Sequence, residues 1–182
     1  MAYFEYGCGV LPNHELVACG VYDRGGISAV GILESDHTIT DFSNASQYTA
    51  AIAAGDLKVI KNIRGTVPDA SPVEGDNPVG CGPDTILNGF NWTATWQDAN
   101  TTSNTIDFYS ALNTRTTALV LFLCGSNEVL VVENKVNYVC NPVMVPANNK
   151  ELQMFNCTAR ASIGPNELPQ KYTAPAGIFE LP

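Results

Sequence analysis

The sequence predicts one mainly β domain, an antiparallel two-sheet sandwich or barrel with one or two short helices and an extended C-terminal arm. Three observations lead to this prediction. Residues 90–96 alternate between apolar and polar side chains, which is the period of a half-buried strand. Residues 118–124 form a continuous apolar run of strand length. Only 15% of the 182 residues are charged, and the abundant Thr, Asn, Ser and Gly suit strands joined by turns.

The strand at residues 90–96 has the clearest pattern. One face carries Phe90, Trp92, Ala94 and Trp96, and the other carries Asn and Thr side chains. An aromatic stripe at strand spacing is more often part of a core than a platform for stacking on sugars. We therefore expect Trp92 and Trp96 to be buried.

The remaining strands are read from apolar runs bounded by turn residues. The run at 118–124 should be buried on both faces, and the turn residues 125–127 should join it to the next strand as a hairpin. A second hairpin is expected in the first half of the chain, around Asp23-Arg24-Gly25-Gly26. The other predicted strands cover residues 15–22, 27–33, 128–133, 135–145 and 151–162.

Two helices are predicted. The first covers residues 45–54 and ends at Gly55, because glycine readily takes the left-handed conformation that terminates a helix. The second covers about residues 105–112 and should lie over one end or face of the sheet. The candidate N-caps are Ser43 or Asn44 for the first helix and Ser103 or Asn104 for the second.

Two segments, residues 66–88 and 164–182, have no regular pattern. The second is predicted to be an arm that follows a single β-rich domain at residues 1–163. Residues 66–88, inside the domain, are rich in Pro, Gly and Asp and predict a long loop. Long ordered loops in compact domains are usually functional or interfacial. Residues 164–182 contain four prolines and little charge, which is typical of an extended segment.

The distribution of charge disfavours a protein that grips nucleic acid. The net charge is −9 with only nine Lys and Arg, and no basic residue occurs from Gly65 to Thr114. Phosphate binding depends on Lys and Arg, so DNA is expected only as non-specific passing cargo along an acidic wall. An acidic surface that simply keeps the protein soluble explains the same pattern.

The six cysteines are predicted to be free and mostly buried thiols. The N-terminal residues lack the basic and apolar regions of a signal peptide, so we expect folding in a cytoplasm, where disulfides are rare. No CxxC pair occurs and neither histidine neighbours a cysteine, so no zinc site is expected. No apolar run approaches the roughly 18 residues of a membrane span, and no membrane partner is expected.

No residue is predicted to be catalytic, to bind a cofactor or to bind a metal. The chain lacks GxSxG, HExxH, Walker and GxGxxG motifs. His14 and His37 fall in polar turn-like segments and are read as solvated turn residues rather than partners of a nucleophile. Asp76, Asp84 and Asn88 do not match a calcium loop and are read as turn formers. We therefore expect a protein that is not an enzyme.

The middle of the chain resembles a known class of proteins. The phrases that carry the resemblance lie at residues 51–60, 63–68, 70–78, 86–91 and 107–112, within a stretch from about 45 to 160. They resemble small structural virion proteins, of the tail-tube or neck-ring type, from tailed bacteriophages infecting Bacteroidetes-like bacteria. Such proteins carry no catalytic residues, and they form rings that stack into a channel for DNA.

The resemblance implies a self-assembling ring or tail-tube subunit that forms part of the DNA channel. Its partners would be copies of itself and adjacent virion proteins, and it would lie in the virion after assembly in the host bacterial cytoplasm. A capsid decoration or head-fibre protein is a second structural reading. A carbohydrate-binding adhesin module would instead require an exposed pair at Trp92 and Trp96. An enzyme would require a pocket with convergent titratable groups.

The arm is expected to take part in assembly. Its tip carries Ile178, Phe179 and Leu181, which would be an aggregation liability if they stayed exposed. Deleting residues 165–182 should therefore leave the β domain folded and weaken self-association. The alternative is that the tip folds back onto its own domain.

Overall fold

The computed structural model describes residues 26–34, 36–67, 70–76, 85–123, 128–143 and 153–175. The elements are β1 (Ile27–Leu33), α1 (Ala45–Ala54), β2 (Leu57–Thr66), β3 (Ser71–Asp76), β4 (Thr85–Asp98), α2 (Ser103–Leu112), β5 (Thr116–Leu123), β6 (Glu128–Val143), β7 (Met154–Ile163) and β8 (Gln170–Thr173). The prediction of a mainly β domain with two short helices is confirmed.

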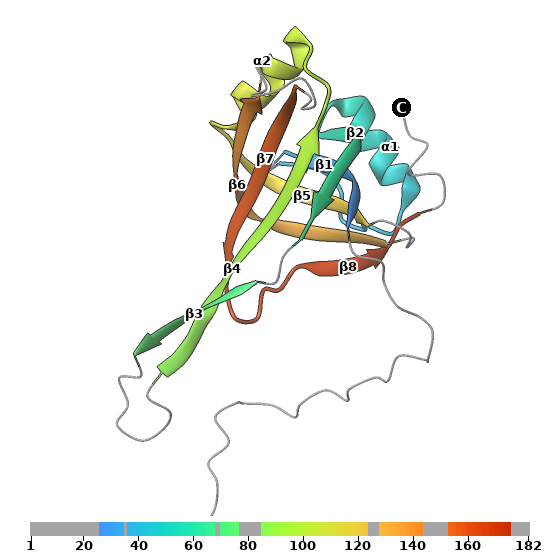
Figure 1. Ribbon diagram of the computed structural model, residues 1–182. Helices are drawn as coiled ribbons and strands as arrows, with labels where there is room; N and C mark the ends of the chain where they lie inside the picture. The colour runs from blue at the N-terminus through green and yellow to red at the C-terminus, as the bar shows by residue number, and fades with distance from the viewer. Residues whose placement is uncertain are drawn as a thin grey trace, which may run out of the picture.

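Of the two architectures predicted, the structure has the barrel. The strand order is β2-β1-β5-β6-β7-β4-β3, and these strands pair antiparallel throughout the described residues. A short additional pairing between β2 and β4 joins the two ends of this path. It closes six strands into a barrel and leaves β3 outside, paired only to the first half of β4 (Figure 1). Closure pairs both edges of each barrel strand over part of its length, which limits unwanted edge-to-edge association.

The barrel interior is one apolar cluster to which all six strands contribute. Trp92, Ala94 and Trp96 of β4 are at most 4% exposed, as their alternation predicted. Tyr109 and Leu112 of α2 belong to the same cluster, because α2 lies across one end of the barrel (Figure 1). The predicted burial of Trp92 and Trp96 is therefore confirmed, while Phe90 at the start of the stripe is half-buried.

A second apolar cluster covers the outside of part of the barrel. It joins Tyr48 and Ala51 of α1 to outward-facing residues of β1, β5 and β6, and to Phe42 and Ala174. Residues of β5 alternate between this outer cluster and the interior, as Val120 and Leu121 do. The prediction that this run is buried on both faces is confirmed for residues 118–122, and it explains why this part of β5 is continuously apolar rather than alternating.

The caps of α1 agree with the sequence prediction. Asn44 accepts a hydrogen bond from the Ser46 backbone N–H at 3.0 Å, and Gly55 ends the helix with a left-handed φ of 88°. For α2 the predicted caps are wrong by one or two residues, because Thr102 occupies the cap position and its hydroxyl accepts from Thr105.

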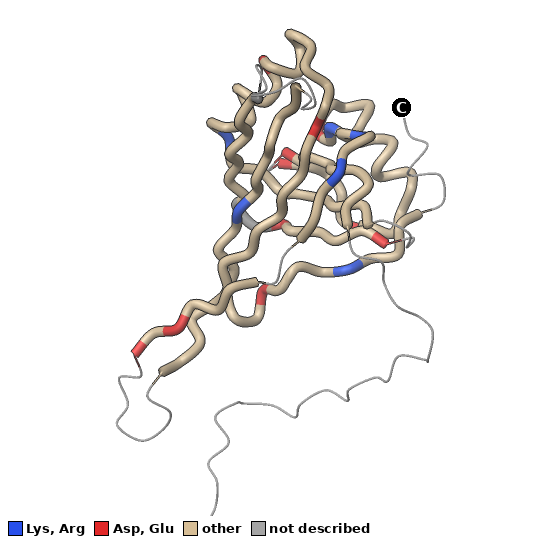
Figure 2. Tube along the Cα trace, in the orientation of Figure 1, with Lys and Arg blue, Asp and Glu red and all other residues tan. Residues whose placement is uncertain are grey.

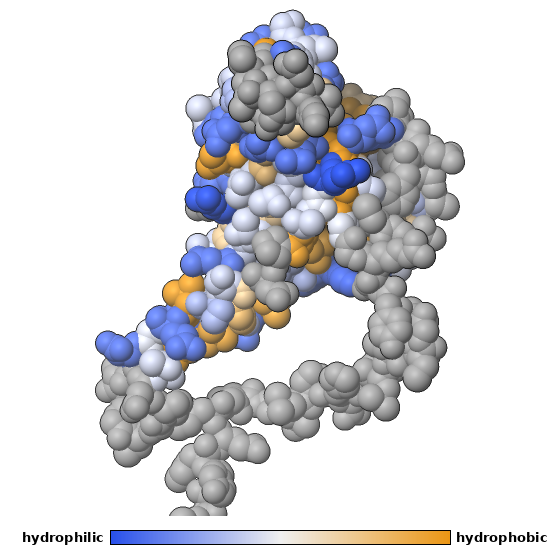
Figure 3. All heavy atoms as spheres, viewed as in Figure 1, coloured by the Kyte–Doolittle hydropathy of each residue, from blue (hydrophilic) through white to orange (hydrophobic). Residues whose placement is uncertain are grey.

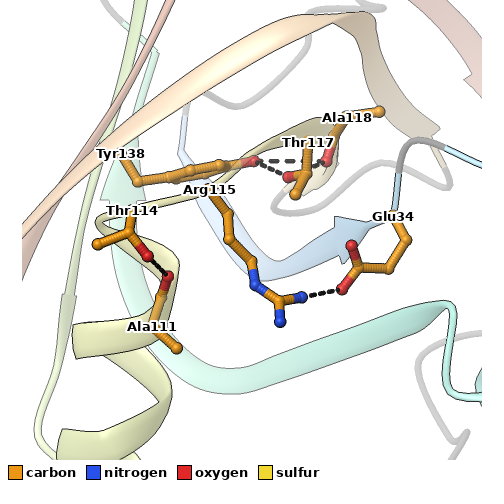
Figure 4. Close-up of polar contacts among 7 residues, drawn as sticks. All are labelled: Glu34, Ala111, Thr114, Arg115, Thr117, Ala118 and Tyr138. Atoms are coloured by element: carbon orange, nitrogen blue, oxygen red, sulfur yellow. Dashed lines mark hydrogen bonds and ion pairs between the residues drawn. The ribbon is translucent and has the colours of Figure 1, made fainter.

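The junction between α2 and β5 is held by one exposed ion pair and by buried polar contacts (Figure 4). Arg115 forms an ion pair with Glu34 at 2.9 Å, which ties the start of β5 to the end of β1. Thr117 and Tyr138 share a buried hydrogen bond of 2.8 Å between β5 and β6. Because the ion pair is solvent-exposed, the buried Thr117–Tyr138 contact contributes more to the position of this junction.

The predicted long loop at 66–88 is partly wrong. Thr66 ends β2, residues 71–76 form β3, and β4 begins at Thr85, so much of the segment is an antiparallel hairpin. The strand at β2 was also not predicted. The β4 strand leaves the barrel at Gly89, where φ is 155° and a Cβ would overlap the carbonyl oxygen of Ile163. Only glycine readily adopts this positive φ and has no Cβ to clash with the Ile163 carbonyl oxygen.

The predicted arm is partly wrong as well. Residues 170–173 form β8, which pairs with Glu128–Val131 of β6, and Ala174 is buried in the outer cluster. This part of the segment packs on its own domain because Tyr172 contacts Phe42, with ring centroids 5.3 Å apart. The two predicted strands at 128–133 and 135–145 form one strand, β6, with a register shift against β5.

Several predictions concern residues outside the described ranges. They are the strand at 15–22, the turns at 23–25 and 125–127, the arm tip at 176–182, His14, Asp84, and Cys8, Cys19, Cys81 and Cys124. Within the described residues, neither α1 nor α2 is long and apolar enough to cross a membrane.

Candidate functional site

The most exposed feature of the fold is the hairpin formed by β3 and the first four residues of β4, Thr85–Asn88. It projects away from the barrel (Figure 1), and of its described residues all but Gly75 are exposed. An isolated two-stranded hairpin is marginally stable in water. A projecting hairpin of this kind is therefore expected to gain stability by contact with another surface.

The hairpin carries apolar side chains where water reaches them. Val73, Ile86 and Leu87 are 37%, 41% and 43% exposed, and they are three of the five most exposed large apolar residues in the described part of the chain. Successive strand residues point to opposite faces, so Ile86 and Leu87 place apolar surface on both faces of the hairpin. The space-filling view shows apolar surface along this projection (Figure 3). Apolar surface gathered in this way usually marks an interaction site.

The outer end of the hairpin is acidic. Glu74 and Asp76 are exposed on β3, and they pair with Leu87 and Thr85 at the end of the ladder that is farthest from the barrel. Figure 2 shows acidic positions in this part of the ribbon. Asn88 covers Gly75 on the opposite strand, where its side chain occupies the space of a Cβ. Asp76 and Asn88 are thus strand residues of the hairpin. The part of the chain that the structure describes holds no cluster of three or more metal-ligating side chains.

A second surface lies along β2. Its register with β1 shifts near Asn62, which has a left-handed φ of 59°, and this bulge bends the strand. Beyond the bulge β2 pairs with β4 through Arg64–Thr66 only. In the described structure, Leu57–Ile63 therefore has one edge without a strand partner.

A groove of about 790 Å³ opens along this unpaired edge of β2. Its apolar lining includes Ile52 of α1, Ile60 of β2 and Phe108 of α2. Lys58 and Lys61 of β2 also line the groove, and neither forms an ion pair with a described residue. We call this surface, from Leu57 to Ile63 with the facing residues of α1 and α2, the β2 groove.

The floor of the β2 groove contains a buried carboxylate. Asp98 is 5% exposed and accepts two hydrogen bonds of 2.8 Å, one from the Tyr109 hydroxyl and one from the Asn100 backbone N–H. Burial, with smaller contributions from Cys157 and Asp98, raises the pKa of Tyr109 well above its ordinary value. Tyr109 therefore stays a neutral donor to Asp98 at physiological pH. Both carboxylate oxygens are occupied, so the pair anchors α2 to the end of β4.

Two of the six cysteines lie in the barrel interior. Cys140 and Cys157 are directly opposite each other on β6 and β7, and each is 2% exposed and free. The hydrogen bond with Cys140, followed by burial, raises the pKa of the Cys157 thiol well above its ordinary value. Since the thiolate is the reactive form, Cys157 should be inert in the folded protein.

We expect Cys140 and Cys157 to resist alkylation by iodoacetamide in the folded chain, because neither thiol is accessible. When the chain is unfolded in denaturant without a reducing agent, all six cysteines should react as free thiols. Mass-spectrometric peptide mapping checks the first result, and thiol titration checks the second. Fewer than five titratable thiols would contradict the prediction of a reduced chain.

The residues singled out for chemistry are dispersed over the fold. His37 packs edge-on against Phe42 in the segment after β1, and its buried Nδ1 has no hydrogen-bond partner in the described structure. Trp92 and Trp96, the pair an adhesin would expose, are buried. The unpaired edge of β2 was missed, and the signal that could have pointed to it is the local group of basic residues Lys58, Lys61 and Arg64.

No protein-family model matches the sequence, and a search of the curated proteins finds no similar one.

Proposed function

We propose that the chain is a structural subunit of a bacteriophage virion that assembles with copies of itself into a ring or tail tube around a DNA channel. The observation that carries the proposal is the projecting hairpin, which exposes Val73, Ile86 and Leu87 on a two-stranded ribbon. Burial of such a ribbon between subunits would stabilise both the ribbon and the assembly. The assignment of the subunit to a virion rests on the resemblance of residues 45–160 to tail-tube and neck-ring proteins.

The charge distribution is consistent with DNA as passing cargo. The outer faces of β4 and β7 carry exposed polar side chains such as Gln97 and Asn156, which bond to each other at 3.1 Å. With Lys and Arg absent between residues 65 and 114, β3 and β4 offer no cation to hold phosphates. The outer face of β4 would let DNA move past it, while the adjoining outer face of β7 carries one exposed cation, Arg160.

A capsid decoration or head-fibre protein remains the second candidate function. The same projecting hairpin would then bind an underlying capsid surface, and isolated subunits would not close into rings. The two functions differ in whether the purified chain associates with itself.

Replacing the exposed apolar residues of the hairpin tests the proposal. The variant Val73→Thr/Ile86→Thr/Leu87→Thr keeps side chains suited to strands but removes apolar contact surface. We expect folding to be unchanged, because the three positions are exposed, and self-association to weaken at least about tenfold. Sedimentation velocity at matched concentrations measures the association.

The matched control is Val139→Thr/Leu168→Thr, which changes two residues of comparable exposure, 42% and 52%, away from the hairpin. It should sediment like the wild type. If the hairpin variant and the wild type associate equally, the hairpin is not an assembly element and the proposal loses its main support.

A further inference from the structure

One strand of this acidic chain carries a third of its basic residues. Lys58, Lys61 and Arg64 are three of the nine Lys and Arg residues, and all three lie on β2. Lys58 and Arg64 are exposed, and none of the three forms an ion pair with a described residue. A local positive patch on a chain of net charge −9 favours a negatively charged partner.

We infer that the partner is the β3–β4 hairpin of a second copy, docked in the β2 groove. This inference rests on the proposed self-assembly and specifies its contact. The acidic end of the hairpin, at Glu74 and Asp76, would face Lys58 and Lys61 of the neighbouring copy. The contact is complementary in charge, whereas hairpin against hairpin would set acidic groups against one another.

The backbone of the two surfaces is complementary as well. Strand β3 is the last strand of the described sheet, so its outer edge has free N–H and C=O groups. The unpaired stretch Leu57–Ile63 has seven residues, and β3 has six. Two free edges of matching length can pair as one continued sheet, in which main-chain hydrogen bonds supply affinity and side chains supply selectivity.

The apolar side chains of the hairpin have a matching place in the β2 groove. On one side of the inserted ribbon, Ile86 or Leu87 would reach the apolar lining formed by Ile52, Ile60 and Phe108. The contact would therefore have an apolar centre and a charged rim, which is the common organisation of protein interfaces.

The inferred contact joins two different surfaces of the same chain. In a ring, each copy would offer its hairpin to one neighbour and its groove to another, which is a head-to-tail association. Head-to-tail contacts generate closed rings when the rotation between subunits closes, and filaments when it does not. This geometry agrees with a ring or tube, whereas two copies that exchanged hairpins reciprocally would stop at a dimer.

Charge reversal in two variants tests the contact. The groove variant is Lys58→Glu/Lys61→Glu, and the hairpin variant is Glu74→Lys/Asp76→Lys. Each should self-associate at least about tenfold more weakly than the wild type at low salt, because two attractive pairs become repulsive. A one-to-one mixture of the two should recover assembly, because every hairpin then finds a groove of opposite charge. Sedimentation velocity measures each sample.

The control variant Asp36→Lys/Glu133→Lys has the same change of charge as the hairpin variant, at exposed positions that belong to neither surface. It should assemble like the wild type. Circular dichroism verifies folding, and where a reversal variant is unfolded, Lys61→Gln and Glu74→Gln should show a smaller, salt-dependent loss of assembly.

The outcomes separate the inference from the proposed function. A wild type that stays monomeric at every concentration contradicts the proposed function itself. A wild type that assembles, with reversal variants that assemble equally well or a mixture that fails to recover, overturns the hairpin-to-groove contact alone. If a segment of the same copy fills the groove, the groove variant loses monomer stability and mixing does not restore assembly, which also overturns the contact.

Discussion

Replacing Trp96 with alanine should lower the free energy of unfolding by about 3–5 kcal/mol, the usual cost of truncating a buried aromatic side chain. Trp96 is 2% exposed and packs edge-to-face on Tyr138, with ring centroids 6.4 Å apart. Its indole N–H has no acceptor in the described structure, so the substitution removes packing without leaving a polar partner unsatisfied. Urea unfolding followed by circular dichroism gives the change in stability.

Val139→Ala is the matched control for Trp96→Ala. Val139 lies on β6 with 42% of its surface exposed, and its truncation should change stability by no more than about 0.5 kcal/mol. If Trp96→Ala costs less than about 1 kcal/mol and alters binding to sugars, the barrel interior is misassigned and an adhesin becomes the better account.

Deleting residues 165–182 should destabilise the domain by about 3–5 kcal/mol, because it removes β8 and uncovers two to three apolar side chains. Tyr172 packs on Phe42, and the buried Ala174 contributes to the outer cluster. This result differs from the sequence-based expectation that the whole segment is dispensable for folding. The Lys171–Glu128 ion pair adds little, because both side chains are substantially exposed.

Deleting only residues 176–182 is the control for the longer truncation. It leaves β8 and its contacts in place, so this protein should be more stable to urea than the one that lacks residues 165–182. Chemical denaturation of both truncated proteins makes the comparison. Equal stability of the two would show that β8 does not hold the outer cluster together.

Local signals in the sequence predicted a large part of the fold. The cap residue Asn44 and the terminating Gly55 set both ends of α1, because each satisfies backbone groups through its own side chain or conformation. The alternation through Trp92 and Trp96 predicted which face of β4 is buried. These features depend only on residues close in sequence, so one segment is enough to recognise them.

The missed elements depend on contacts between distant residues. The pattern of β2 is interrupted at Ile60-Lys61-Asn62, where the bulge occurs, so the strand lacks a clean alternation. β3 contains Pro72, Gly75 and acidic residues, which disfavour strands, and only its pairing with β4 makes it one. β8 is four residues long and gains its register from β6.

The candidate site could be predicted only in its chemical composition. The basic group on β2 and the acidic residues near 74 and 76 are visible in the sequence. Their placement on two separate free edges follows from barrel closure, which pairs β2 with β4 only through Arg64–Thr66. Barrel closure joins strands far apart in the chain, and no local pattern encodes it.

Negative-stain imaging of the purified full-length chain tests the central claim most directly. The account predicts closed rings or stacked tubes of uniform diameter, because a head-to-tail contact repeats with a fixed rotation. Single compact particles of about 19.5 kDa at all concentrations, with the chain folded, would contradict a self-assembling subunit.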